Sequence, residues 1–459
     1  MRNSFSPFIF LLTLLLPLPT SANMVLGVPC QPGDIVLSNA KLVGMQDWQR
    51  GNGWLIIRDG KIDGPYGPKA YPKATDAVRN DVVRIDLKGK WLMPGLHDLH
   101  VHSWGNPSPT HEDFDQMLHT AGTLKMMAIS GVTSILDLGS DENEILPLRD
   151  EQRTKGLDGA TLYSVGGVWV QVEKRPDGNH GVRFVTHVAD VKQQMDEFAA
   201  KNPDFVKVIY DHSGTKVGMG LPVLKEIIAQ AHAHNLRVIT HIALWQDARE
   251  ALQAGADAFT HLDDATDIPD DLVELLNSKR ACVIPTMGVQ AEVANLADDP
   301  TLLTAPLLRA VSSPELLKSY RDIAHYISKA AFWLKWQRES RQTYLRSIKK
   351  LFRSDACVLL GSDTGNLGLF QGYSAQREAQ MYAAAGVDRW DILKAATIAP
   401  ARFLRENAGE LSYGKLANLV ILNKDPLLSV DNWMDIDSVY IRGKWVPRAK
   451  WQIQPVYKN

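Results

Sequence analysis

The central part of the chain alternates short apolar runs with stretches that have the spacing of amphipathic helices. Eight apolar runs are each followed by such a stretch, at residues 92–102, 132–139, 161–170, 205–211, 238–243, 258–262, 282–288 and 358–364. Repeated strand–helix units of this kind are typical of parallel sheets. Eight of them predict an α/β fold, a (β/α)8 TIM-like barrel, with functional side chains at the carboxyl ends of the strands.

The fifth unit shows this pattern most clearly. Ala248, Ala251 and Leu252 form an apolar stripe at helical spacing after the fifth run. Gly255 supplies a helix stop, and the next apolar run begins at once. This tight spacing is that of a strand, a helix and the next strand of one barrel.

Both ends of the chain have the pattern of short strands with turns. Between residues 34 and 91 apolar and polar positions alternate, and Asp59-Gly60 is a hairpin turn signal. The sequences LANLVILNKDP and SVYIRGKWV near the other end have the same pattern. We expect residues 23–91 and 408–459 to form one composite β-sandwich, and residues 92–407 to form the barrel.

A long insert, at about residues 289–353, separates the seventh and eighth runs. Its second half has the pattern of a basic amphipathic helix. A helix of this kind can lie on a membrane surface. The pattern favours instead a lid or a helix packed on the barrel, with a solvated Lys/Arg face.

The first 22 residues have the features of a removable signal peptide. Arg2 precedes the apolar stretch FIFLLTLLLPLP, which is too short to span a bilayer, and Thr20-Ser21-Ala22 offers small residues for cleavage. We therefore expect an exported protein, periplasmic or secreted after cleavage near Ala22, without stable membrane insertion.

Charge and cysteine content narrow the range of partners. A formal net charge of −2 gives no electrostatic argument for nucleic-acid binding. Three cysteines, Cys30, Cys282 and Cys357, cannot form a disulfide framework. A bridge between Cys282 and Cys357 is conceivable, but we predict two buried free thiols. The expected partner is a small-molecule substrate, and homo-oligomer formation is left open.

The strongest chemical signal lies at the end of the first run, Pro94-Gly95-Leu96-His97-Asp98-Leu99-His100-Val101-His102. Alternate residues of a strand point to the same side, so His100 and His102 would project together into the barrel mouth. Two neutral imidazoles at this place form half of a metal site.

Three further strand ends carry matching residues. His241 and His261 each follow an apolar run, and Asp363 ends the eighth run in Gly361-Ser362-Asp363. Each residue alone could be a polar cap of a barrel strand. Together with the pair on strand one, their places on strands five, six and eight predict four imidazoles and a carboxylate at one site.

Lys207 lies among β-branched residues of the fourth run, where a buried cation is costly. One account is a salt bridge to a barrel carboxylate. The account that we favour is a neutral amine that captures CO2 as a carbamate, whose two oxygens can bridge two cations.

In these motifs and their order the chain resembles the amidohydrolase superfamily, in particular its imidazolonepropionase-like and prolidase-like (Xaa-dipeptidase) branch. Gly414-Lys415-Leu416-Ala417-Asn418 also fits, although Asn418 stands where the family usually has aspartate. The resemblance implies a first divalent metal on His100, His102 and Asp363. It implies a second metal on His241 and His261, with carboxylated Lys207 bridging the two. Nitrogen and carboxylate ligands favour Zn²⁺.

The expected reaction is hydrolysis of an amide-type C–N bond in a dipeptide, an acylated amino acid or a cyclic amide. A metal-bridging hydroxide would attack the carbonyl, and Asp363 would take its proton and pass it to the leaving nitrogen. The same site could serve an esterase or lactonase. A non-catalytic metal- or ligand-binding barrel is a third hypothesis, and the joint presence of Asp363 and Lys207 argues against it.

Two residues are candidate substrate contacts. His180, in Asp177-Gly178-Asn179-His180-Gly181, resembles part of a glycine–histidine loop of the same branch, although a plain turn histidine fits nearly as well. Tyr210 follows Lys207 closely and could line the pocket. The sequences His241-Ile242-Ala243 and Tyr210-Asp211-His212-Ser213-Gly214 differ from those of the dipeptidases. The catalytic core therefore carries over from the resemblance, and the specificity pocket does not.

Overall fold

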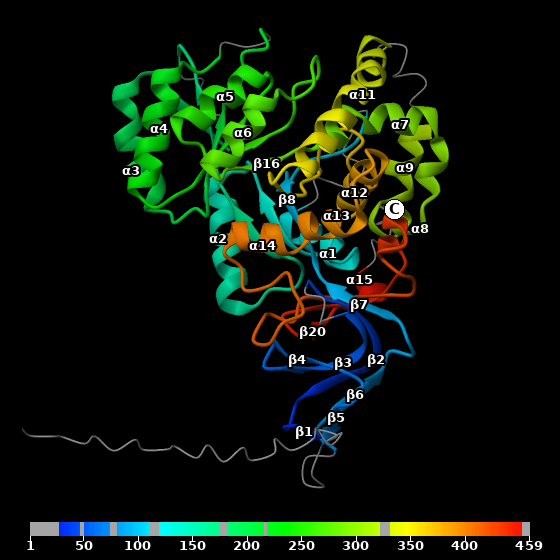
Figure 1. Cartoon of the computed structure of the whole chain (residues 1–459). Coiled ribbons are helices and arrows are strands. Elements are labelled where there is room, and N and C mark those ends of the chain that lie inside the picture. Colours follow the sequence, from blue (N-terminus) through cyan, green and yellow to red (C-terminus); the bar gives the residue numbers. More distant parts are fainter. Residues whose placement is uncertain are drawn as a thin grey trace, which may run out of the picture.

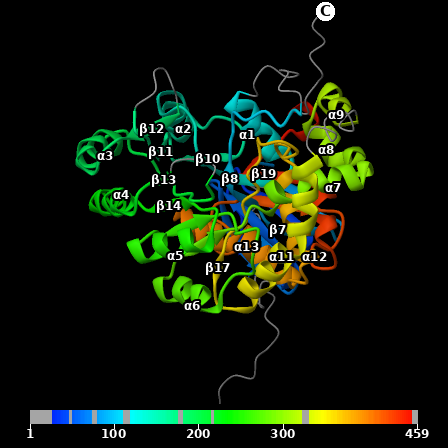
Figure 2. The same ribbon diagram turned by 90° about the horizontal axis from the view of Figure 1, so that it is seen from above.

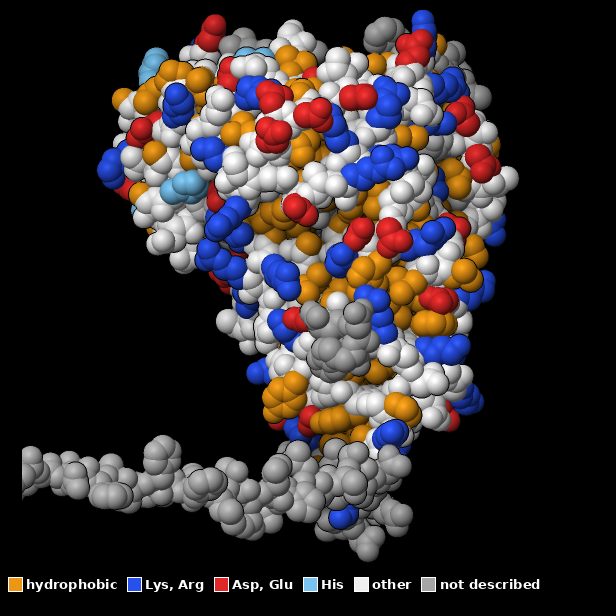
Figure 3. Space-filling model, in the orientation of Figure 1, with side chains coloured by type: hydrophobic (Ala, Val, Ile, Leu, Met, Phe, Trp, Pro, Cys, Tyr) orange, Lys and Arg blue, Asp and Glu red, His pale blue; other side chains and the backbone are white. Residues whose placement is uncertain are grey.

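The computed structural model describes residues 27–45, 50–73, 80–109, 119–174, 181–214, 218–321 and 331–451. The predicted signal peptide and His180 lie outside these residues. A barrel with its surrounding helices stands above a sheet built from both ends of the chain (Figure 1). On the face shown in Figure 3, side chains of both charge signs are interspersed.

Eight parallel strands follow the eight predicted runs and form the barrel wall. They are β8 (Leu96–Val101), β9 (Val132–Asp137), β10 (Thr161–Ser164), β13 (Val206–Ile209), β14 (Val238–His241), β15 (Ala258–Thr260), β16 (Cys282–Ile284) and β17 (Cys357–Val358). One sheet holds β8 to β10 and another holds β13 to β17. Backbone hydrogen bonds join the sheets, from Asp204 N to Ser164 O at 3.0 Å and from Leu99 N to Leu360 O at 3.0 Å. The predicted TIM-like barrel is confirmed.

All eight regular strands end before their predicted runs do, and two of them end furthest short. The run at 161–170 forms β10 and a separate β11 (Val168–Gln171), because Gly166 has a φ of 61° and turns the chain between them. β11 lies between β13 and an additional strand, β12 (Val182–Val185). The eighth run is a regular strand only at β17, because the chain leaves strand geometry before Asp363, whose φ is 57°.

Helices cover the outside of the barrel (Figure 2). They are α1 (Thr120–Ile129), α2 (Glu142–Lys155), α3 (Val191–Ala199), α4 (Leu221–Ala233), α5 (Trp245–Ala254), α6 (Asp270–Lys279), α12 (Ser374–Ala384), α13 (Arg389–Ala396) and α14 (Ile398–Leu404). Gly255 ends α5 with a φ of 104°, as its position predicts. In β13, Val206 and Val208 pack against the helices, so Lys207 between them faces the barrel cavity.

The two ends of the chain pair in one eight-stranded sheet. Its strands are β2 (Ile35–Val43), β3 (Arg50–Arg58), β4 (Lys61–Tyr66), β6 (Val83–Asp86), β7 (Trp91–Pro94), β18 (Leu419–Leu422), β19 (Ile436–Ile441) and β20 (Lys444–Trp445). The two ends meet where β18 runs antiparallel to β7, with Leu419 opposite Pro94. The predicted pairing of the ends is thus confirmed, and the exact domain limits stay a prediction. A short sheet of β1 (Gly27–Pro29) and β5 (Tyr71–Lys73) lies apart from it.

The insert folds into several helices beside the barrel mouth. They are α7 (Glu292–Asp298), α8 (Pro306–Val311), α9 (Pro314–Arg321) and α11 (Ala331–Arg353). α11 buries Leu334, Tyr344, Ile348 and Leu351, so it packs through one face. It contacts α7 and α12, which lie beside it in Figure 1. Within the described ranges, each helix is too short or too polar to serve as a membrane span.

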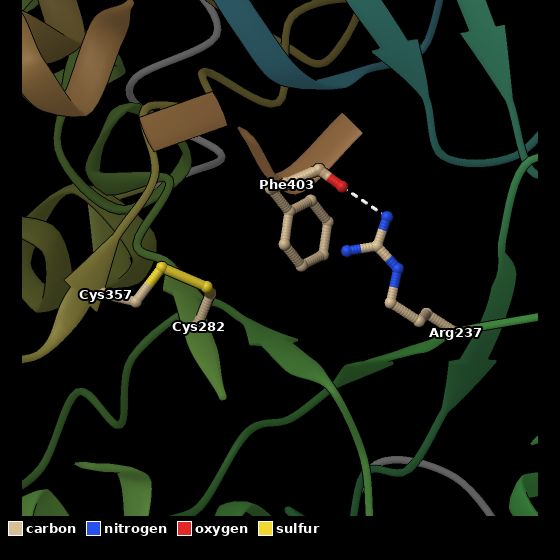
Figure 4. The surroundings of a disulfide bond; sticks show 4 residues. All are labelled: Arg237, Cys282, Cys357 and Phe403. Carbon is tan, nitrogen blue, oxygen red and sulfur yellow. Dashed lines mark hydrogen bonds between the residues drawn. A yellow bond between two sulfur atoms is a disulfide. The ribbon is translucent and has the colours of Figure 1, made fainter. Parts of the chain in front are cut away.

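The prediction of two free thiols at Cys282 and Cys357 is wrong. The two residues are register partners on β16 and β17, their Cα atoms lie 4.6 Å apart, and their sulfurs form a disulfide (Figure 4). They are separated by 75 positions in the sequence, so only the barrel order brings them together. Near the disulfide, Arg237 donates a hydrogen bond to Phe403 O. Cys30 is a buried free thiol.

Candidate metal centre and active site

The carboxyl end of the barrel brings six predicted site residues to one cavity. His100, His102, Lys207, His241, His261 and Asp363 all line this cavity, whose volume is about 440 Å³. They come from strands one, four, five, six and eight of the barrel. Parallel strands present their carboxyl ends at one face, so residues far apart in the sequence meet there.

Asp363 lies between the imidazole rings. Its Oδ1 is 3.2 Å from His100 Nε2 and 3.0 Å from His102 Nε2. Its Oδ2 is 3.9 Å from His261 Nδ1. Ligand atoms of His100, His261 and Asp363 all lie within 4.8 Å of one another, which suits a single cation held by several ligands. The ring of His241 extends the group, with its centroid 4.4 Å from that of His261.

Burial keeps most of these imidazoles neutral. Burial lowers the pKa of His100 and of His261 well below the ordinary value, and nearby positive groups lower it further. Burial also lowers the pKa of His241, against the effect of Asp211. At His102 the hydrogen bond and charge of Asp363 outweigh burial and raise the pKa. A neutral imidazole has the free lone pair that a metal needs.

A neighbouring threonine fixes which nitrogen of His261 carries the proton. The Thr286 hydroxyl donates to Pro285 O at 2.8 Å, so it accepts from His261 Nδ1 at 2.6 Å. The lone pair of a neutral His261 is then on Nε2. Hydrogen bonds of this kind orient the ligands of metal sites.

Lys207 is buried and donates from Nζ to Thr260 Oγ1 at 2.6 Å. Burial lowers its pKa to about 7, although the charge of Asp363 opposes the shift. Among the described residues, Lys207 has no carboxylate within ion-pair distance, which disfavours the salt-bridge account. A substantial fraction of the amine is therefore neutral near pH 7 and can act as a nucleophile.

The backbone at three strand ends adopts the left-handed conformation. His261 has a φ of 75°, Thr286 a φ of 51° and Asp363 a φ of 57°. Such a conformation is uncommon for residues other than glycine and costs about 1–3 kcal/mol each where the surroundings enforce it. Its concentration at the ends of strands six, seven and eight is typical of a functional site.

Two supporting residues have no role in the sequence prediction. Asp98 accepts hydrogen bonds from Ser362 Oγ at 2.5 Å and from His100 N at 3.2 Å, so it ties strand one to strand eight behind the cluster. Asn366 Nδ2 donates to Asp363 Oδ1 at 2.8 Å. Asp98 stands within the motif at residues 94–102, so the sequence could have marked it as a site residue. Asn366 is a loop residue, and no sequence pattern marks it.

The rest of the cavity wall differs from the expected one. Tyr210 is buried, its hydroxyl donates to Glu250, and it does not line the cavity, so we leave it out of the proposed substrate site. The aromatic residue on the wall is Trp336, from α11. Asp264 and Gln290 add polar groups to a largely apolar wall. No sequence motif marks these three residues. For Gln290 and Trp336, the fold of the insert decides which side chains reach the barrel mouth, and Asp264 lies on the loop after β15.

Sequence comparison identifies partial relatives of the chain. An uncharacterised protein of Mycobacterium tuberculosis is 25% identical over 222 residues, which are 46% of this chain and 54% of that protein. An imidazolonepropionase of Bradyrhizobium sp. is 29% identical over 152 residues, 31% of this chain and 37% of that enzyme. The chain thus spans about half the length of the first of these relatives, and less of the second.

Structural comparison extends the likeness to the whole fold. A Xaa-Pro dipeptidase solved with methionine in its active site superposes with a TM-score of 0.70 at 17% identity, covering 90% of this chain and 99% of that one. The model of the amidohydrolase family matches residues 91–446, which take in the barrel and the closing strands. The resemblance noted in the sequence is thereby confirmed, and the chain belongs to the amidohydrolase family.

Proposed function

We propose that this enzyme is a metal-dependent hydrolase of an amide-type C–N bond in a dipeptide, an acylated amino acid or a cyclic amide. The observation that carries the proposal is the position of Asp363, whose carboxylate is within 3.2 Å of two histidine nitrogens in a cavity that is also lined by His241, His261 and Lys207. A carboxylate among neutral imidazoles can hold a metal and transfer a proton.

We assign His100, His102 and Asp363 to a first divalent ion, and His241 and His261 to a second. Carboxylated Lys207 would bridge the two ions. The donor set fits this assignment, since burial favours neutral rings at three of the histidines and a neutral amine at Lys207. Nitrogen and carboxylate donors favour Zn²⁺.

When bound, two such ions supply Lewis acidity that ionises a water near neutral pH and polarises the substrate carbonyl. The protein supplies proton transfer through Asp363. Its Oδ1 accepts from Asn366 and faces His100 and His102, so Oδ2 is the oxygen that would take the proton of the attacking water. The same oxygen would then give the proton to the leaving nitrogen, as general acid–base catalysis requires.

Metal analysis of the purified protein tests the assignment. We expect about two divalent ions per chain, as in other paired-metal hydrolases, and the loss of at least one in the double variant His100→Ala/His102→Ala. His232→Ala is the matched control, because this half-exposed histidine pairs with Asp257 away from the cavity. An unchanged metal load in the double variant would refute the assignment. A screen of dipeptides, acylated amino acids, cyclic amides, esters and lactones then separates amide from ester hydrolysis.

Chemical rescue tests the modification of Lys207. Lys207→Ala should lose activity, and acetate or propionate should restore part of it by occupying the space of the carbamate. A crystal structure with two metals bound and an unmodified Lys207 would contradict carboxylation.

Export of the protein to the periplasm or medium, after cleavage near Ala22, is also part of the proposal. The disulfide between Cys282 and Cys357 supports it, because disulfides persist in oxidising compartments. Mass spectrometry of the mature amino terminus, together with cell fractionation, measures both cleavage and location. A cytoplasmic protein that keeps residues 1–22 would refute export.

A further inference from the structure

Part of the cavity wall is formed by residues other than the predicted metal ligands, and this part presents hydrogen-bond acceptors. Asp264 stands on the loop after β15, Gln290 belongs to the turn after β16, and Trp336 comes from α11. All three line the same cavity as His100 and Asp363. Their contacts show which groups a substrate could meet there.

The loop after His261 carries two adjacent carboxylates with different tasks. Asp263 is buried and serves the backbone, since it accepts from Trp245 N at 3.0 Å and from Ala265 N at 2.9 Å. Asp264 accepts from Trp336 Nε1 at 2.5 Å through Oδ2. In the part of the chain that the structure describes, its Oδ1 accepts no hydrogen bond and the carboxylate forms no ion pair. Asp264 therefore has capacity for a donor from a ligand.

Gln290 offers a second acceptor that lacks a partner. Its Nε2 donates to Leu262 O at 3.0 Å, which fixes the orientation of the amide group. Its Oε1 is buried and has no hydrogen-bond partner among the described residues, although only 9% of the residue is exposed. A buried acceptor without a partner is unfavourable, and a ligand N–H would satisfy it.

Apart from Lys207 and the histidines, the charged side chains around the cavity are carboxylates. A second cavity of about 900 Å³, which shares His102 and Val168 with the first, carries Asp141 and Glu144. On the described lining of these two cavities, Lys207 is the single Lys or Arg. Carboxylation would make that residue anionic as well. Two metal ions would add positive charge at their ligands, so the preference concerns the wall formed by Asp264 and Gln290. There a carboxylate and an unpartnered amide oxygen favour a cation and oppose a carboxylate.

We propose that the cavity selects an amide substrate with an ammonium group near the scissile carbonyl, bound by Asp264 and Gln290 against the indole of Trp336. A free carboxylate at this wall is not required and is disfavoured. The two free acceptor oxygens, Asp264 Oδ1 and Gln290 Oε1, can accept two of the three N–H donors of an ammonium group, and an aromatic ring adds cation–π attraction. This inference rests on the proposed function and names its substrate class.

Three substrates and two variants of the metal-loaded enzyme test the inference. Leucine p-nitroanilide carries the ammonium group, N-acetyl-leucine p-nitroanilide lacks it, and leucylglycine adds a carboxylate. The wild type should prefer the first. Asp264→Asn should raise KM for the first substrate by about tenfold or more, because it removes a charge-assisted hydrogen bond, and should change the acetylated one by less than about twofold.

Lys174→Met is the matched control for charge. Lys174 lines a neighbouring cavity beyond Ile209, where it could attract a substrate carboxylate. The inference predicts little effect of this variant on leucine p-nitroanilide. It is overturned if leucylglycine is the best substrate and Lys174→Met abolishes that preference, or if Asp264→Asn affects all three substrates equally.

Calorimetric binding separates this inference from the proposed function. Benzylamine and benzoate have similar shapes and opposite charges at pH 7. Asp264→Asn should weaken benzylamine binding by about tenfold and leave benzoate binding unchanged, with Trp336→Phe intermediate for benzylamine. Failure of the wild type to hydrolyse any amide, with this binding pattern intact, would refute the proposed function alone. Equal benzylamine affinity in wild type and Asp264→Asn would refute the inference alone.

Discussion

The two ends of the barrel use the same residue types in opposite ways. At the amino end of β8, His97 Nε2 lies 2.9 Å from Glu406 Oε2. Glu406 Oε1 accepts from Ser134 Oγ at 2.9 Å and from Asn418 Nδ2 at 3.3 Å. One carboxylate thus has donors on both oxygens, and these donors come from the barrel and from the closing sheet. This network is closed at the carboxylate, while His97 Nδ1 is buried and has no hydrogen-bond partner among the described residues.

At the carboxyl end of the same strand, three residues beyond His97, the network is open. His100 shares the carboxylate of Asp363 with His102, and His261 lies close by. The rings line a cavity and leave lone pairs without a proton donor. Two buried histidines on one strand thus serve different purposes. The closed network fastens parts of the fold together, whereas the open one has capacity for an ion.

The closed network also explains why Asn418 replaces the aspartate that the family usually has. Asn418 Nδ2 donates to Glu406 Oε1, and its Oδ1 accepts from Arg442 N at 2.8 Å. A carboxylate at this position could accept from Arg442 N but could not donate to Glu406. An amide satisfies both neighbours, whereas an aspartate would place two buried carboxyl groups in contact.

Asp363→Asn should give the largest effect, on catalysis at the open end. Asparagine keeps the size of the side chain but cannot take a proton from water. Loss of a positioned acid–base group costs about 100- to 10,000-fold, so kcat should fall within that range while the thermal midpoint changes little. Steady-state kinetics, metal analysis and thermal unfolding of the same preparation measure all three quantities. Near-normal turnover on any substrate that the wild type hydrolyses would show that Asp363 is not the proton carrier.

The contrast between the ends also explains what the sequence could predict. The histidines and Asp363 were found because they mark strand ends, and parallel strands bring their ends to one face. Lys207 was found because a lysine among β-branched residues of a strand is costly to bury. Pairings that depend on three-dimensional order were missed. The bond between Cys282 and Cys357 needs β16 beside β17, and the contact of Trp336 with Asp264 needs the fold of the insert.

The disulfide should give the next largest effect, on stability at the closed end. Cys282 and Cys357 join two strands across 75 positions, and a crosslink of this span restricts the unfolded chain. Cys282→Ser/Cys357→Ser, or reduction of the wild type, should lower the free energy of unfolding by about 2–4 kcal/mol. Denaturant unfolding at a fixed metal concentration measures the change, with kcat expected to stay the same. A loss of metal or activity without a loss of stability would contradict the idea that the amino end of the barrel serves stability and the carboxyl end serves catalysis.

Glu406→Gln should have a smaller effect of the same kind. It leaves His97 and Ser134 in competition for one remaining acceptor, which should cost about 1–3 kcal/mol of unfolding free energy. Glu151→Gln is the control, because this exposed residue pairs with Lys155 on the surface and should change stability by less than about 0.5 kcal/mol. Metal content should be unchanged in both variants. If Glu406→Gln released metal, the amino end would be part of the site, contrary to the comparison.

Glu378→Gln sharpens the comparison, because Glu378 makes closed contacts near the open end. Its carboxyl oxygens accept from Met287 N at 2.9 Å and from Gly288 N at 3.0 Å, and burial raises its pKa to about 8 against those hydrogen bonds. Between about pH 4.5, the usual value for glutamic acid, and pH 8 the folded protein keeps a proton that the unfolded chain releases. The contribution of this carboxyl to stability is therefore full below that range and is lost as the pH rises through 8.

Glutamine does not titrate, so the thermal midpoint of the variant minus that of the wild type should increase from pH 5 to pH 8 and then level off. The catalytic rate should not change, since Glu378 does not line the cavity. A midpoint difference that is constant across this pH range would mean that the Glu378 carboxyl is ionised in the fold, and a change in kcat would place it with the open network rather than the closed one.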